Sequence, residues 1–250
     1  MRFLDIRCNG LQGSTNAFGI YHSSFYQGVT FDTVLDQCRT FLAANPGEVL
    51  IMRVKKEDGT SNDVGGAFGQ IFDGYLGAKG YGPLFFTQNR IPTLGEARGR
   101  IVLIAQFGNT LPCLQWPAGD NGVFTTDRFY LQDHYKGSGL AGLDSGSAGT
   151  GSAGVSSMIG VGSSGGDKFS HVKACLDRAA GDPSNMLQYI NFTSYADNAW
   201  PVDNAAAILP KVQAYLQANQ NTAAHYGIVP MDFPDRHPTV LNLLLNKNFG

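Results

Sequence analysis

Residues 49–57 read VLIMRVKKE, a mainly apolar run of strand length that ends in three charged residues. A helical pattern precedes it: Thr30 is a suitable N-cap, apolar side chains recur on one face up to Leu42, and Asn45-Pro46-Gly47 ends the helix. Strands that alternate with helices along a chain form parallel α/β sheets. This stretch therefore predicts an α/β fold.

Five further apolar runs have the length of a strand. They are Phe3–Arg7, Ile101–Gln106, Phe129–Asp133, Leu187–Phe192 and Ile228–Phe233, with Ile20–Tyr21 as a weaker candidate. Their continuous apolar character predicts strands that are buried on both faces. Pro210 suits the first turn of a later helix, and Val240–Leu245 forms a last short one. An eight-stranded barrel would be short by one or two strands.

Residues 137–166 differ from the rest of the chain, because 11 of these 30 residues are Gly and 8 are Ser. Such a composition predicts a flexible insertion between the strand that ends near Asp133 and a helix that begins near Lys168. A tolerated surface insertion is favoured over a functional lid. We expect one domain over residues 1–250 with this insertion inside it.

Composition excludes some classes of protein. Of the 250 residues 43% are hydrophobic, which is enough for a sizeable core. Lys and Arg number 18 against 20 Asp and Glu, so a protein that binds nucleic acid through a broad basic field is disfavoured. No run approaches the roughly 18 apolar residues of a membrane-spanning helix.

The four cysteines are Cys8, Cys38, Cys113 and Cys175. Their wide spacing, without a CxxC or Cys/His pattern, gives no indication of a zinc site. Two disulfides and four buried thiols remain equally open.

Polar residues gather where the apolar strands end. They are Asp5 and Arg7, Lys55 to Glu57, Gln106, Asp133 with Tyr135, and Asp232. Charged groups at the carboxyl ends of parallel strands are typical of a barrel active site. His22 lies in a short loop after Ile20–Tyr21, and its ordinary pKa suits proton transfer near neutral pH.

Several motifs in order along the chain resemble bacterial phosphatidylinositol-specific phospholipase C. They are residues 4–7 (LDIR), 20–26 (IYHSSFY), 41–48, 52–57 (MRVKKE), 91–99 (IPTLGEARG), 131–136 (LQDHYK), 189–194 (YINFTS) and 231–233 (MDF). Each motif is modest alone, and together they cover nearly the whole chain.

The resemblance implies a distorted TIM-type (βα) barrel without a bound metal or other cofactor. It implies cleavage of phosphatidylinositol, or a related inositol phospholipid, to diacylglycerol and a cyclic inositol phosphate. In that reaction the inositol 2-hydroxyl is the nucleophile, one His removes its proton and a second His protonates the diacylglycerol oxygen. A secreted monomer that touches the membrane surface transiently is expected, with no nucleic acid partner.

The resemblance also implies roles for particular residues. His22 matches the general acid, Arg7 the arginine that binds the phosphate, and Asp5 the acidic residue beside it. Lys55, Asp133 and Tyr135 match positions that hold the inositol ring. Asp232 matches the carboxylate that orients the general-base His.

Two departures from the family pattern matter. The segment that supplies the general-base His lies upstream of Met1, so we expect a chain that lacks the first βα unit. Such a chain is an impaired enzyme or a protein that only binds inositol headgroups. The family often has an arginine at the position of Gln106, where glutamine binds substrate without supplying charge.

Two weaker hypotheses complete the predictions. A metal-dependent phosphodiesterase of the glycerophosphodiester type would need a cluster of acidic ligands, and Glu57 and Asp5 are too few. Trp116 and Trp200 follow strand ends and are candidates for a rim that faces lipid. Packing under a loop is the alternative for both.

Overall fold

A computed structural model describes residues 2–136, 164–184, 186–196, 199–222 and 224–247. The chain divides into two compact units, Met1–Trp116 and Pro117–Gly250. The prediction of a single domain over the whole chain stays a prediction.

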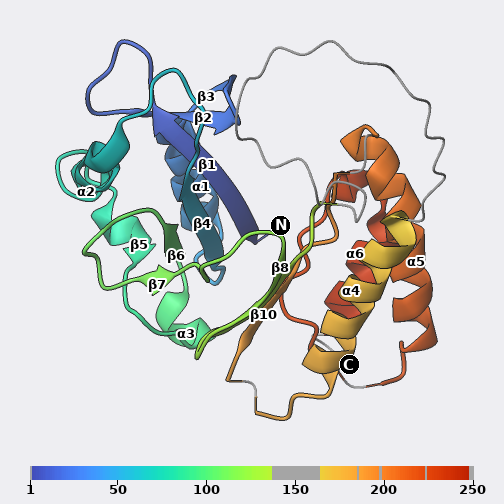
Figure 1. Cartoon of the computed structure of the whole chain (residues 1–250). Coiled ribbons are helices and arrows are strands. Elements are labelled where there is room, and N and C mark those ends of the chain that lie inside the picture. Colours follow the sequence, from blue (N-terminus) through green and yellow to red (C-terminus); the bar gives the residue numbers. More distant parts are fainter. Residues whose placement is uncertain (1, 137–163, 185, 197–198, 223, 248–250) are drawn as a thin grey trace, which may run out of the picture. The chain divides into compact units, whose positions relative to one another are not determined.

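The first unit is built on a seven-stranded sheet in the order β3-β2-β1-β4-β6-β5, with β7 also paired to β6 (Figure 1). Its strands are β1 (Phe3–Gly10), β2 (Phe18–His22), β3 (Phe25–Thr30), β4 (Leu50–Lys56), β5 (Phe85–Phe86), β6 (Ile101–Gln106) and β7 (Leu114–Gln115). The central strands β1, β4 and β6 are parallel, and β2 and β3 form an antiparallel hairpin at one edge. The three central strands are the ones that the apolar runs predict.

Two helices cover one face of this sheet. Helix α1 (Phe31–Ala44) begins at Thr30, whose hydroxyl accepts a hydrogen bond from the Thr33 amide, and ends at Asn45, as the sequence predicts. Helix α2 (Phe68–Leu76) was not predicted; its Phe68, Phe72 and Tyr75 side chains pack into the same core. The short helices η1 (Gly65–Ala67), η2 (Gly82–Leu84) and α3 (Leu94–Ala97) complete the unit.

The two faces of the central strands differ in chemistry. Leu4, Ile6 and Cys8 of β1, together with Met52 and Val54 of β4, lie in the helix-covered core. Since side chains alternate along a strand, the residues between them point to the other face, and several are charged. The predicted burial on both faces holds for β4, where Met52, Arg53 and Val54 in succession are buried, but not for β1, in which residues 3–7 are only partly buried.

The second unit contains a three-stranded sheet in the order β10-β9-β8, and helices pack around a core of their own. Its elements are β8 (Gly122–Thr125), β9 (Phe129–Asp133), α4 (Ser164–Ala180), β10 (Gln188–Asn191), α5 (Pro201–Ala218), η4 (Pro234–Arg236) and α6 (Pro238–Asn246). Strands β9 and β10 are parallel. The predicted last helix is confirmed as α6.

Two predictions about this unit are wrong. Helix α5 begins at Pro201, so Pro210 lies inside the helix rather than in its first turn. Pro201 already has the position where a missing N–H costs nothing. The predicted strand over Ile228–Phe233 is reduced to a single bridge between Ile228 and Ile190, so Asp232 lies outside any strand.

Residues 137–163 of the predicted insertion lie outside the described residues, and α4 starts at Ser164, slightly earlier than expected. None of the helices in the described ranges combines the length and the hydropathy that crossing a bilayer requires.

Candidate active site

The structure brings four of the predicted site residues onto one face of the first unit's sheet. In the register of the parallel strands Asp5 is opposite Arg53, Arg7 is opposite Lys55, and Lys55 is opposite Gln106. Paired residues of neighbouring strands point to the same side of a sheet. These five side chains therefore form a polar face, on the side opposite the helices.

Arg53 is the residue at this face that the sequence analysis missed. Its Nη1 donates to both carboxylate oxygens of Asp5 at 3.2 Å, and its Nε donates to the Gln106 Oε1 at 2.8 Å. Its Nη2 donates to the same amide oxygen. The guanidinium lies 4.0 Å from the centre of the Trp116 ring, and the side chain is only 5% exposed. It is a buried cation in the middle of an apolar run.

The guanidinium of Arg7 is the more open of the two. Its Nη2 lies 3.4 Å from the Asp5 carboxylate, and the side chain is 36% exposed. One carboxylate thus lies between two arginines, one buried and one accessible to solvent. An exposed arginine held by a fixed carboxylate is suited to binding a phosphate oxygen, because the N–H groups of a guanidinium form a planar fork.

His22 is the last residue of β2, directly before the turn of the β2–β3 hairpin, and is exposed. The next residue, Ser23, has a positive φ of 54°, and its amide donates to the Glu57 Oε1 at 2.8 Å. The Glu57 Oε2 lies 3.3 Å from the Lys55 ammonium. The hairpin turn is therefore attached to the end of β4, and Lys55 there is the register partner of Arg7.

A buried asparagine fixes the segment after β4. The Asn9 side chain donates to the Glu57 carbonyl at 2.7 Å and to the Asp63 carboxylate at 3.2 Å. Hydrogen bonds from Lys56, from the Gly65 amide and from Asn9 lower the pKa of Asp63 to about 2. Asp63 is thus ionised at neutral pH and holds the loop beside the polar face.

In the second unit Tyr135 and its neighbours form a small cluster. The Tyr135 hydroxyl donates to Asp120 at 2.6 Å, and the Lys136 ammonium lies 3.1 Å from the same carboxylate. Burial, followed by the hydrogen bond to Asp120, raises the pKa of Tyr135. The Asn121 side chain accepts hydrogen bonds from the amides of Tyr135 and Lys136, which fixes the chain just after β9.

A second buried cation, which the sequence analysis did not single out as a site residue, lies beside the predicted site residue Asp133. Lys168 of α4 donates to the Gln132 Oε1 at 3.1 Å and to the His134 carbonyl at 2.8 Å. Burial lowers the pKa of Lys168 to about 7, and the charge of Asp133 opposes that shift. The ring of His134 stacks on that of His171, with 3.6 Å between the ring centres.

Asp232 follows the segment that binds the end of β10, where the Thr193 hydroxyl donates to the Pro230 carbonyl at 3.0 Å. Burial raises the pKa of the Asp232 carboxyl. The structure therefore makes Asp232 a partly desolvated acid rather than a solvated loop residue.

Two open questions from the sequence have answers in the structure. All four cysteines are buried free thiols, which leaves no disulfide among them. Trp116 is buried over Arg53, so the prediction that it faces lipid is wrong, whereas Trp200 is 77% exposed at the start of α5. Within the described residues no three His, Cys, Asp or Glu side chains gather as metal ligands would.

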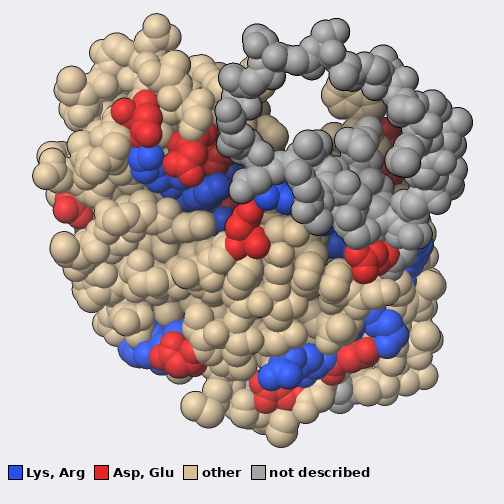
Figure 2. All heavy atoms as spheres, in the orientation of Figure 1, with Lys and Arg blue, Asp and Glu red and all other residues tan. Residues whose placement is uncertain are grey.

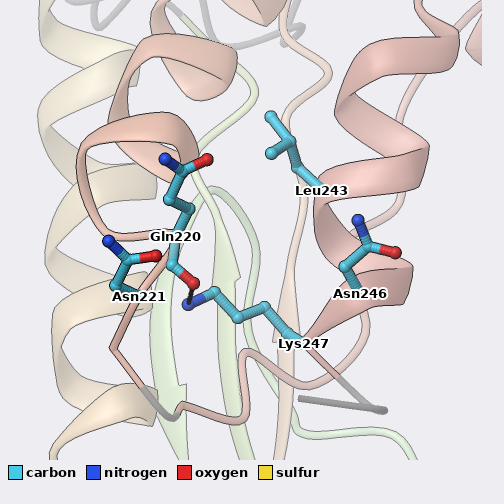
Figure 3. Close-up of a pocket in the computed structure, with 5 residues that line it drawn as sticks. All are labelled: Gln220, Asn221, Leu243, Asn246 and Lys247. Carbon is cyan, nitrogen blue, oxygen red and sulfur yellow. Dashed lines mark hydrogen bonds between the residues drawn. The ribbon is translucent and has the colours of Figure 1, made fainter.

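Two other surface features do not resemble an active site. Figure 3 shows a pocket of the second unit in which Lys247 reaches back to the end of α5. Its ammonium donates to the carbonyls of Asn219 and Gln220 at 2.6 and 3.0 Å, which caps the helix. On the face drawn in Figure 2, basic and acidic side chains lie next to one another, in small mixed groups.

Comparison with known proteins shows which protein family the first unit resembles. Residues 1–107 match the family model "Phosphatidylinositol-specific phospholipase C, X domain". These residues include β1, the hairpin, β4 and β6, which carry the polar face. The first unit is thus similar to an X domain.

The similarity extends to particular proteins. A 1-phosphatidylinositol phosphodiesterase of Listeria monocytogenes is 25% identical over 252 residues, which is 100% of this chain and 69% of the relative. A 1-phosphatidylinositol phosphodiesterase of Staphylococcus aureus strain Newman is 27% identical, and the match covers 92% of this chain and 70% of that protein. The resemblance predicted from the motifs is confirmed: the chain is similar to these bacterial enzymes over most of its length.

Solved structures agree with the sequence matches. The H258Y mutant of the phosphatidylinositol-specific phospholipase C from Staphylococcus aureus has a TM-score of 0.71 and 25% identity, and the match covers 93% of this chain and 73% of that one. The phosphatidylinositol-specific phospholipase C from Listeria monocytogenes has a TM-score of 0.70, and the match covers 98% of this chain and 78% of that one. The predicted α/β, barrel-type fold is confirmed by this likeness.

Proposed function

We propose that the protein cleaves phosphatidylinositol by the phospholipase C reaction, without a metal ion. The observation that carries the proposal is the polar face, where Arg7 and Lys55 are neighbours in register and the hairpin turn after His22 is bonded to the same strand end. The similarity to 1-phosphatidylinositol phosphodiesterases supports the choice of substrate.

Under this proposal Arg7 holds the phosphoryl oxygens. Phosphoryl transfer needs fixed positive charge where negative charge develops, and an arginine fork provides it in a bidentate geometry. Asp5 orients the guanidinium from 3.4 Å. In this proposal the arginine supplies the charge that a divalent cation supplies in other phosphodiesterases.

His22 is proposed as the general acid. Attack of the inositol 2-hydroxyl on phosphorus forms the cyclic phosphodiester and breaks the bond from phosphorus to the diacylglycerol oxygen. The leaving oxygen takes its proton from the His22 imidazole, which is exposed directly before the hairpin turn. No residue of the printed sequence is assigned as the base that removes the proton from the 2-hydroxyl.

Hydrogen-bonding side chains are proposed to hold the inositol ring. Lys55 of the first unit donates to ring hydroxyls. For Asp133 and Tyr135 of the second unit, contact with the ring stays a prediction from the resemblance. Asp232, a partly desolvated carboxyl, keeps the role that the resemblance implies, which is to orient the imidazole of the general-base His; that His is not assigned to any residue of the printed sequence. Gln106 lies at the edge of the polar face and contributes a further hydrogen bond.

Contact with the membrane surface is proposed through exposed apolar side chains. Phe25 is 71% exposed and follows the His22 turn, and Trp200 is 77% exposed. Aromatic side chains favour the interface between lipid and water. Secretion and a monomeric state, which the resemblance implies, stay predictions.

The test uses vesicles of phosphatidylinositol and phosphatidylcholine, and cyclic inositol phosphate is measured by phosphorus NMR. His22→Gln is expected to lower kcat about 10²–10⁴-fold because it removes the general acid. Binding of the protein to myo-inositol should be unchanged, since the glutamine leaves Arg7 and Lys55 intact. The exposed His225→Gln is the matched control and should not change the rate.

Each result decides between the two predicted functions. Cleavage that His22→Gln abolishes supports the enzyme. Binding of myo-inositol without any product, in the wild type as in the variant, would replace the enzyme with the headgroup-binding alternative. Absence of both cleavage and binding would overturn the proposal, and loss of activity on chelation would assign the charge to a metal ion instead of Arg7.

A further inference from the structure

The polar face has its buried arginine on a different strand from the one that the family resemblance implies. At the end of β6 the chain has Gln106, and the guanidinium next to it belongs to Arg53 of the neighbouring strand β4. A guanidinium is therefore present near this edge of the sheet. It belongs to Arg53, however, and the residue at the edge itself is Gln106, whose amide oxygen accepts its hydrogen bonds. The group that a ligand meets at this edge therefore depends on how the Gln106 amide is oriented.

Hydrogen-bond chemistry fixes the orientation of the Gln106 amide. A guanidinium has five N–H donors and no acceptor, so only the amide oxygen can face it. Nε and Nη2 of Arg53 both donate to this Oε1. The Gln106 Nε2 group, which makes no hydrogen bond to the residues that the structure describes, is left to donate elsewhere.

Arg53 itself cannot act on a ligand directly. Its side chain is 5% exposed, its Nη1 is held at 3.2 Å by the Asp5 carboxylate, and the Trp116 ring covers it at 4.0 Å. A charge so enclosed keeps its partners in one geometry. Arg53 therefore acts through the two side chains that it binds.

We propose that Arg53 is a positioning residue that locks Gln106 as a hydrogen-bond donor and so makes this edge specific for acceptor oxygens of the headgroup. The locked N–H group has the polarity that an arginine at position 106 would offer. Polarisation by the guanidinium strengthens the donor without bringing a second full charge to the ligand. The inference rests on the proposed function and names the chemistry of one of its subsites.

Gln106→Glu separates this role from a structural one. The carboxylate keeps two acceptors for Arg53, so the melting temperature should stay equal or rise, but the group facing the ligand becomes an acceptor. We expect binding of the ligand to weaken about tenfold or more, the loss of one hydrogen bond to a polar group. A purely structural pair predicts unchanged binding.

Exchange of the two residues is the complementary test. Arg53→Gln should raise KM for phosphatidylinositol about tenfold, and the double variant Arg53→Gln/Gln106→Arg should recover most of it by returning a guanidinium to the edge. Arg39→Gln, an exposed arginine on α1 of the same unit, is the control and should leave KM unchanged. If Arg53→Gln does not fold, the KM of the double variant and the ligand binding of Gln106→Glu still test the inference.

Two probes distinguish the acceptor and separate this inference from the proposed function. Calorimetry with myo-inositol tests hydroxyl oxygens, and calorimetry with inorganic phosphate tests phosphoryl oxygens; Gln106→Glu should weaken one of them. If wild type and Gln106→Glu bind each probe with equal affinity, the inference is overturned, and the proposed cleavage of phosphatidylinositol is not affected. A wild type that binds neither probe and cleaves nothing overturns the proposed function, and the inference falls with it.

Discussion

Among the residues that the structure describes, each unit has one buried cation, and the two are stabilised in different ways. Arg53 in the first unit is bonded to the Asp5 carboxylate and to an amide oxygen. Lys168 in the second unit is bonded to an amide oxygen and a backbone carbonyl, and none of the ion pairs among the described residues includes it. The first cation is charged at any ordinary pH, whereas burial lowers the pKa of the second to about 7.

This difference shows what each site is suited to do. A guanidinium within a network holds neighbouring side chains in place and does not titrate. A desolvated amine near neutrality changes its charge when its surroundings change. Positioning is therefore expected of the first site, and sensitivity to pH of the second.

The largest effect expected at one fixed pH comes from removing the anion of the first network. Asp5→Ala leaves the buried Arg53 without its carboxylate, and breaking a buried ion pair costs about 3–5 kcal/mol. Asp5 is 22% exposed, which lowers the expected loss in the free energy of unfolding to about 2–3 kcal/mol. Urea denaturation followed by circular dichroism measures it.

The exposed carboxylate Asp58 gives the matched control. Its side chain is 84% exposed and lies 3.5 Å from Lys56, so Asp58→Ala should change stability by less than about 0.5 kcal/mol. An equal loss in both variants would mean that the network around Arg53 contributes no more than a surface ion pair.

A second effect, visible only as a pH dependence, is expected at Lys168. Its pKa is about 7 in the folded state and near 10.5 when the chain unfolds, so between these values the unfolded state holds more protons. The wild type should therefore gain stability as the pH rises from 7 to 10, by at most about 1.4 kcal/mol per unit. Lys168→Met has no such proton to lose, and its stability relative to the wild type should fall over this range.

Chemical denaturation at pH 6, 8 and 10 measures this difference. Burial lowers the pKa of His134, so this ring near Lys168 is neutral at pH 8 and 10 and does not confound these two values. Lys173→Met is the control on the same helix, because Lys173 is half-exposed and pairs with Asp177 at 2.6 Å. A difference between wild type and Lys168→Met that stays constant with pH would show that the amine is ionised throughout.

The contrast also explains which features of the fold and of the site could be predicted from the sequence. The capped helix after Thr30 and the central parallel strands follow from local patterns and were predicted correctly, and Lys55 and Gln106 lie at the ends of their strands as expected. Asp5 and Arg7 do not end their strand, because β1 continues to Gly10. Arg53 was missed because its partners Asp5 and Gln106 are 48 and 53 residues away in sequence. They meet it only through the strand register, which one sequence does not reveal.

Other failures have a similar origin. Gln106 was predicted to supply no charge, which is true of the side chain alone, but a neighbouring strand brings a guanidinium to it. The end of the chain from Ile228 has the composition of a strand and forms a single bridge instead. Tertiary packing decides between such outcomes, and composition does not.

The smallest effect is expected from the thiols. Cys8, Cys38 and Cys113 lie in the first unit and Cys175 in the second, and all four are buried and free. Burial raises the pKa of Cys175 to about 12 and that of Cys38 to about 11, so these thiols are protonated and unreactive at neutral pH. Dithiothreitol should therefore leave the melting temperature unchanged, and a thiol reagent should label the cysteines only after denaturant is added. Fast labelling of the native protein, or a melting temperature that falls on reduction, would contradict the burial of the thiols in one unit or the other.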